Sequence, residues 1–168
     1  SEIPVMNFQH LEDFKTGQIL LIDKPLEWTS FDVVNKLRGH LRHALKVKKI
    51  KVGHAGTLDP LASGVLVVCT GKATKRIETL QAQDKSYTAT IRLGAHTPCL
   101  DAELPVDAWC DCSHLQFSDV ETAADQWRGK IEQLPPLYSA KKVNGQKAYA
   151  VARKGGEIEL RRASIEIK

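Results

Sequence analysis

One carboxylate, Asp59, stands in a glycine-rich run that extends from Gly53 to Gly64, and His54 precedes it by five residues. The glycines of this run indicate a backbone that bends sharply or is approached closely, because glycine alone adopts a positive φ without penalty. A carboxylate in such a turn can act as a nucleophile or as a general base. We therefore predict a catalytic site around Asp59.

The Asp59-Pro60 pair is equally typical of the start of a helix. Aspartate is a favoured N-cap, proline is favoured at the first helical position, and Gly64 would end the helix. The two interpretations are compatible, since a helix N-terminus stabilises the negative charge that a nucleophile or base needs. We predict a short helix that begins at Asp59.

The elements before and after this run must position it. Residues Ile19 to Asp23 form a short apolar run that predicts a buried strand, and Val65 to Cys69 predicts a central strand directly behind the site. Thr29-Ser30-Phe31-Asp32 is a capping signature. Behind it, a helix is predicted whose apolar face comprises Phe31, Val34, Leu37, Leu41 and Leu45.

Further elements follow in the second half of the chain. Thr74 to Leu80 predicts a short helix, and the alternation from Tyr87 to Leu93 predicts a strand. Ser118 to Trp127 predicts a helix that starts with a capping box and that Gly129 can close. The Asn144-Gly145 pair predicts a two-residue hairpin, and a helix at Ala148 to Lys154 and a strand at Ile158 to Lys168 complete the expected elements.

Length and composition limit the classes of protein to which the chain can belong. Its 168 residues, 42% hydrophobic and 26% charged, suit one soluble domain, and no apolar run approaches the roughly 20 residues that span a bilayer. The four cysteines have the uneven spacing 69, 99, 110 and 112, which does not suit a secreted disulfide scaffold. We expect a cytoplasmic, monomeric protein without membrane attachment.

Charges are segregated along the chain, although the net charge is only +4. Residues 35–54 carry seven Lys or Arg and no acid, whereas residues 97–127 carry seven Asp or Glu and no Lys or Arg. A solvated surface would explain one such run. Basic runs on both sides of the glycine-rich turn favour a face that binds nucleic acid.

The glycine-rich run resembles the defining motif of the TruB-type tRNA pseudouridine synthases. Asp23-Lys24-Pro25 with Thr29-Ser30 resembles the N-terminal Lys-Pro motif of that family, and Lys85-Ser86-Tyr87 its Lys-x-Tyr motif. Similar matches in order and spacing extend from about Gly17 to the end, through Gly71-Lys72-Ala73-Thr74-Lys75, Leu93-Gly94 with Thr97 and Asp101, and Pro135 to Gly155.

The resemblance implies an α+β pseudouridine-synthase fold, with a mixed, mostly antiparallel central sheet flanked by helices. It implies isomerisation of a uridine in the T-loop of tRNA, without cofactor or metal. Asp59 matches the essential aspartate, which attacks the sugar C1′ or takes the 2′ proton. Tyr87 matches the aromatic residue that stacks on the base, His54 a residue that holds the flipped nucleotide, and Asp101 a second active-site acid.

The tRNA, through its T-arm, is therefore the expected partner. The reaction requires that the uridine be extruded from its loop, and hence a stacking platform and basic surface around it. We expect five lysines to contact RNA: Lys24, Lys72, Lys75, Lys85 and Lys142.

The chain departs from the family pattern in two respects. Glu27 stands where the Lys-Pro motif usually has glycine, which raises the question of the backbone conformation there. The arginine that pairs with the catalytic aspartate, the Lys-x-Leu motif and the C-terminal RNA-binding domain have no counterpart in residues 1–168. We expect these residues to be the N-terminal part of the catalytic domain, and to be inactive by themselves.

Three alternatives differ in class. The chain could be an RNA-binding or RNA-folding module that retains the fold without catalysis. A metal site at Cys99, Cys110, Cys112 and His114 is disfavoured, because the Cys-x-Cys-x-His spacing is not that of common zinc sites. A phosphate-binding P-loop is disfavoured, because Ala73 follows Gly71-Lys72 where that motif has Ser or Thr.

Overall fold

The computed structural model describes residues 10–134, 142–143, 146–147 and 162–168. The chain divides into two compact units, residues 1–89 and 90–168, and each is described by itself. Helices and antiparallel strands occur in both, which confirms the predicted α+β class. Among the described residues, none of the helices combines the length and apolar character that crossing a membrane requires.

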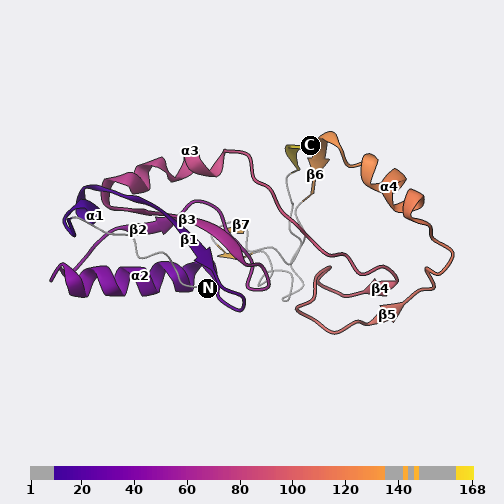
Figure 1. Ribbon diagram of the computed structural model, residues 1–168, viewed down its shortest axis with the longest axis horizontal. Coiled ribbons are helices and arrows are strands. Elements are labelled where there is room, and N and C mark those ends of the chain that lie inside the picture. Colours follow the sequence, from indigo (N-terminus) through magenta and orange to yellow (C-terminus); the bar gives the residue numbers. More distant parts are fainter. Residues whose placement is uncertain (1–9, 135–141, 144–145, 148–161) are drawn as a thin grey trace. The chain divides into compact units, whose positions relative to one another are not determined.

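The first unit is built on a three-stranded antiparallel sheet in the order β1-β3-β2 (Figure 1). Its strands are β1 (Ile19–Lys24), β2 (Val52–His54) and β3 (Gly64–Thr70). The apolar, valine-rich sequence of β3 suits its central position between two partners. The predicted strands at 19–23 and 65–69 are thus confirmed in position, with one extra residue at the end of the first and one at each end of the second. The expected burial is wrong on one face of the sheet, where Leu21 and Val65 are exposed.

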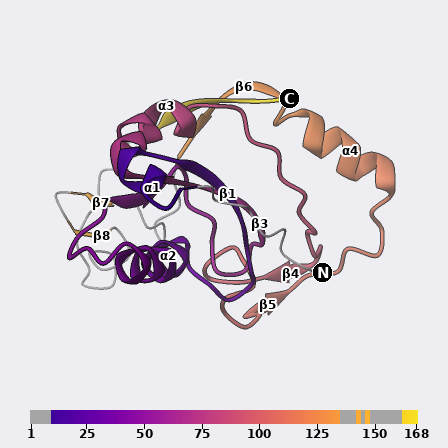
Figure 2. The same ribbon diagram turned by 60° about the vertical axis from the view of Figure 1, so that its left-hand side comes forward.

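Helix α2 (Ser30–Ala44) lies along one face of this sheet (Figures 1 and 2). Thr29 is its N-cap and forms a capping box with Asp32, as the capping signature predicted. The core between helix and sheet contains Val33, Val34 and Leu41 of α2, with Leu20, Val52, Leu66 and Val68 of the strands. Phe31 does not belong to it, since the side chain is 59% exposed, and the predicted apolar face is wrong at that residue.

Short helices complete the first unit. Helix α1 (Asp13–Thr16) buries Phe14 in the core, and the 3₁₀ helix η1 (Gly71–Arg76) continues into α3 (Ile77–Gln81). The last two elements confirm the helix predicted near 74–80. Cys69 of β3 is fully buried, and burial raises the pKa of its thiol, so that this cysteine stays protonated and inert.

The strand predicted from Tyr87 to Leu93 is wrong. Residues 84–92 adopt neither helix nor strand, and Tyr87, Ile91 and Leu93 are exposed. Alternation of apolar residues produces a strand only where a neighbouring strand supplies hydrogen bonds, and no described strand pairs with this segment.

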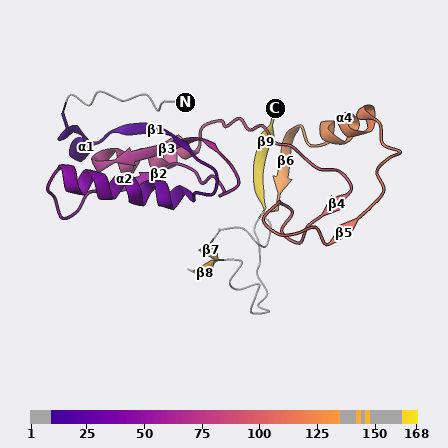
Figure 3. The same cartoon turned by 60° about the horizontal axis from the view of Figure 1, so that its bottom comes forward.

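In the second unit, the described residues form three two-stranded antiparallel ribbons and one helix. Strand β4 (Ala95–His96) pairs with β5 (Ala108–Trp109), and β6 (Gly129–Gln133) pairs with β9 (Ala163–Ile167), as Figure 3 shows for the latter. Strands β7 (Lys142–Val143) and β8 (Gln146–Lys147) pair across a two-residue connection, which confirms the predicted hairpin. The expected strand at the end of the chain is confirmed for 163–167.

The helix predicted from Ser118 to Trp127 is present as α4 (Phe117–Asp125), which begins one residue earlier and ends two residues earlier. Its N-cap is Gln116, whose backbone N–H donates to the Asp119 carboxylate at 2.8 Å, instead of the Ser118 with Glu121 that the sequence pattern favoured. Gly129 does not close this helix as predicted, because α4 ends at Asp125 with Gln126 as its C-cap, and Gly129, with a φ of 84°, is the first residue of β6. The helix expected at 148–154 lies outside the described residues.

Candidate active site

Asp59 lies in the connection between β2 and β3, which carries the glycine-rich run. The Ala62 N–H donates to the Asp59 carbonyl at 3.0 Å, and the backbone then straightens into β3 from Gly64. This single bond closes a β-turn with Pro60 at its second position. The predicted helix from Asp59 is therefore wrong, because β3 begins before a second helical bond can form.

The glycines have the roles that their spacing indicated. Gly56 and Gly64 adopt φ values of 107° and 124°, which only glycine tolerates without strain. Gly53 is instead approached closely, since a Cβ there would lie 2.8 Å from Cδ1 of Ile77. The first unit thus uses one glycine for close packing against α3 and two for the course of the loop.

A serine at the start of α2 holds the residue before Asp59. The Ser30 hydroxyl donates to the Leu58 carbonyl at 3.1 Å and accepts from the Leu58 N–H at 2.9 Å. Ser30 is only 2% exposed, so that both bonds are shielded from water. One buried hydroxyl therefore pairs both backbone groups of the residue next to the carboxylate.

A second hydrogen bond joins the Lys-Pro loop to Pro60, the residue that follows Asp59. The Glu27 N–H donates to the Pro60 carbonyl at 2.8 Å. Together with Ser30, this bond fixes the backbone on both sides of Asp59. Sequence reasoning did not assign either residue to the site, although Ser30 belongs to the Thr29-Ser30 pair of the recognised motif.

Glu27 makes its bond from a left-handed backbone conformation. Its φ is 66°, in the region that favours glycine. The glutamate in place of the usual glycine therefore leaves the loop with a glycine-like conformation, at a cost of about 1 kcal/mol in local strain. The loop therefore keeps the left-handed conformation at residue 27, although that residue is not glycine.

His54 ends β2 and bonds within the loop. Its Nδ1 lies 2.6 Å from the Gly56 carbonyl oxygen. Since a carbonyl oxygen only accepts, Nδ1 carries the hydrogen, and Nε2 is the nitrogen left for another partner. The ring is half-buried, so the histidine supports the turn while Nε2 is available to a ligand.

The Asp59 carboxylate is exposed. Within the described part of the chain, no residue donates a hydrogen bond to it or forms an ion pair with it. The loop backbone is thus held rigidly while the side chain is left for an external group. That combination suits a nucleophile or base better than a structural cap.

Two further predicted site residues lie in less constrained segments. Tyr87 belongs to the first unit and is 69% exposed, and a ring so exposed can stack on an aromatic ligand. Asp101 lies in the second unit, where its Oδ1 accepts from the Glu103 N–H and from the Cys99 thiol, both at 2.9 Å. Among the described residues, no hydrogen bond joins Tyr87 to Asp59, and Asp101 belongs to the other unit, so the membership of both in the site stays a prediction.

The predicted RNA contact at Lys24 is wrong, because the structure buries this side chain. Its side chain is 0% exposed, and Nζ donates to the carbonyls of Pro25 and Trp28 at 2.9 and 2.6 Å. An ammonium group buried in this way cannot reach a phosphate. Lys24 instead shapes the loop that carries Glu27.

The other expected lysines differ in position. Lys72 and Lys75 are exposed on η1, with no carboxylate within ion-pair distance among the described residues. Lys85 donates to the carbonyls of Gln81, at the end of α3, and Gln83. Lys142 lies in β7, and its side chain is outside the description.

The described residues contain no group of three or more His, Cys, Asp or Glu side chains placed to hold a metal ion. Cys99, Cys110 and Cys112 are free thiols. The alternative metal site at these cysteines and His114 therefore has no structural support.

Comparison with a family model and with curated proteins identifies the family. Residues 42–168 match the model described as TruB family pseudouridylate synthase, N-terminal domain. Proteins named tRNA pseudouridine synthase B are 55% identical in Phocaeicola vulgatus and 54% in Parabacteroides distasonis, each over 92% of this chain, and 47% in Flavobacterium johnsoniae over 89% of it. The chain spans 66% of the length of each of these relatives.

Among solved structures, a chain of a Cbf5-Nop10-Gar1 complex is similar, with 25% identity and a TM-score of 0.48 over 84% of this chain and 37% of that one. The family model alone covers 127 of the 168 residues, from 42 to 168, and includes the whole glycine-rich run. The chain therefore belongs to the TruB family of pseudouridylate synthases.

Proposed function

We propose that this chain is part of an enzyme that isomerises uridine to pseudouridine in tRNA, at a uridine of the T-loop. The observation that carries the proposal is the geometry of Asp59. Its carboxylate is exposed, while hydrogen bonds from Ser30 and Glu27 hold the backbone on both sides of it. Curated relatives that share about half of its residues are named for this activity on tRNA.

The isomerisation needs no external reactant. In one route, an Asp59 carboxylate oxygen attacks C1′ of the ribose, forms a C–O bond and displaces uracil as the C1′–N1 bond breaks. Rotated uracil then attacks C1′ through C5 and expels the carboxylate, and the C5 proton is lost as N1 gains one. In the other route, Asp59 takes the 2′ proton as the C1′–N1 bond breaks, which leaves a glycal and displaced uracil. C5 of the rotated uracil then adds to C1′, the proton returns to C2′, and the C5 proton is lost as N1 gains one. Both routes need one well-positioned carboxylate, and both conserve all atoms.

The remaining predicted residues would serve the extruded nucleotide. Tyr87 offers an exposed ring for stacking on the uracil, and Nε2 of His54 is available for a phosphate or ribose oxygen. Asp101 would be the second acid of the site. Four of the five expected lysines would contact the RNA backbone: Lys72, Lys75, Lys85 and Lys142. Lys24 is left out of this set because it is buried.

The substitution Asp59→Asn in the intact protein tests the proposal. It keeps the size of the side chain and removes its charge and nucleophilicity. Pseudouridine formation in tRNA should fall by at least about 10³-fold, since no other group can replace the reacting atom. The affinity for tRNA should stay within about twofold, since the phosphate contacts that dominate it are unchanged.

Ser63→Asn is the matched control, because Ser63 is exposed in the same loop. It should leave both pseudouridine formation and binding unchanged. A wild-type protein that binds tRNA yet forms no pseudouridine would contradict the proposal and favour the RNA-binding or RNA-folding module. Full activity of the Asp59→Asn variant would exclude Asp59 as the reacting group.

A further inference from the structure

One lysine ties the segment that carries Tyr87 to the helix before it. The Lys85 ammonium group donates to the Gln83 carbonyl at 2.7 Å, and also to the carbonyl of Gln81, the last residue of α3. A lysine side chain has three N–H donors. Two of them are thus used on protein carbonyls, and one is left for the RNA phosphate proposed above.

The end of a helix is a favourable place for an ammonium group. The last carbonyls of a helix have no partner within the helix, and they carry the negative end of the helix dipole. Helix α3 has only five residues, and so short a helix depends on contacts outside itself. Lys85 therefore stabilises the C-terminal end of α3, a role that its place in the Lys-x-Tyr motif did not indicate.

The segment that follows has few other contacts. Residues 84–92 form neither helix nor strand, and Tyr87 is 69% exposed. In the part of the chain that the structure describes, no backbone hydrogen bond outside helices and strands involves residues 85–89, and only Lys85 among them forms side-chain hydrogen bonds. One residue, Ser86, separates Lys85 from Tyr87. The two bonds of Lys85 therefore fix the point from which the chain leads to the tyrosine.

The other end of α3 packs against the glycine-rich run. A Cβ at Gly53 would lie 2.8 Å from Cδ1 of Ile77, the first residue of α3. Gly53 belongs to β2, the strand that ends at His54. Helix α3 thus connects the start of the Asp59 loop to the carbonyls that Lys85 contacts.

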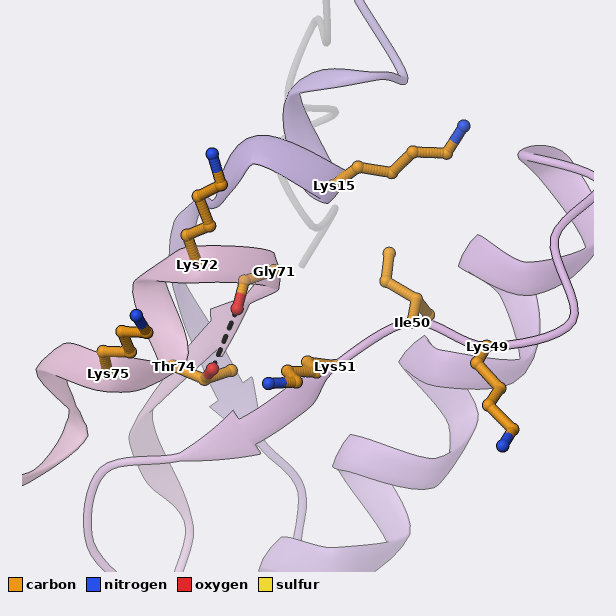
Figure 4. A pocket seen from close by; sticks show the side chains of 8 residues that line it. All are labelled: Lys15, Lys49, Ile50, Lys51, Gly71, Lys72, Thr74 and Lys75. Carbon is orange, nitrogen blue, oxygen red and sulfur yellow. Dashed lines mark hydrogen bonds between the residues drawn. The ribbon is translucent and has the colours of Figure 1, made fainter.

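The 3₁₀ helix η1, which leads directly into α3, is also held in place. The Gly71 N–H donates to the Lys51 carbonyl at 2.9 Å, next to β2. The Thr74 hydroxyl donates to the Gly71 carbonyl at 2.8 Å, the bond dashed in Figure 4. These bonds fix η1 to the first unit, so that α3 offers Lys85 a fixed support.

We propose that Lys85 is a positioning residue for Tyr87. The proposal rests on the function proposed above, in which Tyr87 stacks on the uracil of the target uridine. By holding the chain against the end of α3, Lys85 limits the positions that the ring can take before RNA binds, and less conformational freedom is then lost on stacking. Because Lys85 acts through the ring, its contribution should largely disappear when the ring is removed.

A double-mutant cycle in the intact protein tests this inference, with Lys85→Ala, Tyr87→Ala and the double variant. Both side chains are exposed, so that neither substitution leaves a cavity in the core. Two quantities are measured: the affinity for a single-stranded oligoribonucleotide that contains uridine, and the rate of pseudouridine formation at saturating tRNA.

Two further variants serve as controls. Lys85→Arg keeps the positive charge and the N–H donors. Gln83→Ala removes an exposed side chain from the same turn and leaves the carbonyl that Lys85 contacts. Lys85→Arg should therefore restore most of the rate and the affinity, and Gln83→Ala should change neither.

Lys85→Ala should lower the rate at saturating tRNA about fivefold and weaken oligonucleotide binding about tenfold. In the Tyr87→Ala background, the same substitution should weaken binding no more than about threefold, because only the phosphate contact is then lost. Equal losses with and without the ring would show that Lys85 contacts phosphate alone, and would overturn the inference. An unchanged rate and affinity in Lys85→Ala would overturn it as well.

Pseudouridine formation by the wild-type protein separates the two proposals. If the wild type forms pseudouridine and Lys85→Ala weakens binding equally in both backgrounds, only the positioning inference fails. If the wild type forms none, the proposed activity fails, and a smaller loss of binding in the Tyr87→Ala background would still support Lys85 as a positioning residue for a tyrosine that stacks on RNA.

Discussion

At the level of single residues, Ser30 holds the backbone of the residue that precedes Asp59. Its hydroxyl forms two hydrogen bonds with Leu58, 28 residues away in the chain, at a position that is 2% exposed. Removal of a buried partner costs about 1–3 kcal/mol when the groups left behind find no replacement. If Asp59 reacts as proposed, Ser30 is a positioning residue, which acts on the reaction through the backbone next to Asp59.

The substitution Ser30→Ala should lower the rate of pseudouridine formation at saturating tRNA about tenfold or more, because Asp59 loses its fixed position. The Kd for tRNA should stay within about twofold. Ser30→Thr, which keeps the hydroxyl, should restore part of the rate. An equal loss with Ser30→Thr, or a loss confined to binding, would contradict the positioning role.

The left-handed conformation of Glu27 makes a prediction about stability. Glycine adopts its φ of 66° without strain, so that Glu27→Gly should stabilise the protein by up to about 1 kcal/mol, after the greater freedom of glycine in the unfolded chain is deducted. Thermal unfolding measures the change. Leu26→Gly, at an exposed neighbour with ordinary φ, should lower stability instead. A lower melting temperature for Glu27→Gly would show that the glutamate side chain contributes more than its backbone costs.

At the scale of elements, the start of α2 connects helix formation to the site. The Asp32 N–H donates to the Thr29 hydroxyl at 3.1 Å, and the Asp32 carboxylate accepts from the Thr29 N–H at 2.9 Å. This capping box sets where α2 begins, and Ser30 is the first helical residue after the cap. A cap at the helix start therefore also places the hydroxyl that holds Leu58.

Hydrogen bonds from Thr29 lower the pKa of Asp32 below its usual value. A lowered folded-state pKa means that the carboxylate stabilises the fold above the unfolded-state pKa, and that this contribution disappears as the pH falls through the folded-state value. Asp32→Asn should therefore be less stable than the wild type near neutral pH, and the difference should shrink below about pH 4. Denaturant unfolding at several pH values measures this. Glu78→Gln, exposed in the first turn of α3, should show a smaller difference, and a gap that stays constant with pH would contradict the assignment.

At the scale of the whole molecule, the segregated charges of the sequence find a partial structural explanation. The basic run of residues 35–54 contributes Lys49 and Lys51 to a pocket in the first unit, which Lys72 and Lys75 of η1 also line. The acidic run of residues 97–127 belongs to the second unit. With a net charge of only +4, the proposed affinity for RNA would come from local concentration of positive charge and not from the total.

Features that depend on neighbouring residues could be predicted from the sequence. The strands at Ile19 and Val65, the cap at Thr29 and the hairpin around residues 144–145 each follow from a pattern within a few positions. The strand expected at Tyr87 could not be predicted correctly, because a strand also needs a partner that alternation does not supply. The helix expected at Asp59 failed because β3 begins too soon after the turn.

Local patterns in the chain identified the family, the candidate carboxylate Asp59 and the glycines that shape its loop, because a motif and its local conformation depend on residues close together in the chain. Only the tertiary structure decided that Lys24 is buried, that Ser30 holds Leu58, and that lysines from three segments surround one pocket. These features depend on contacts between residues far apart in the chain. Such contacts determine which side chains are buried and which charged side chains lie near one another, and no local sequence pattern encodes them.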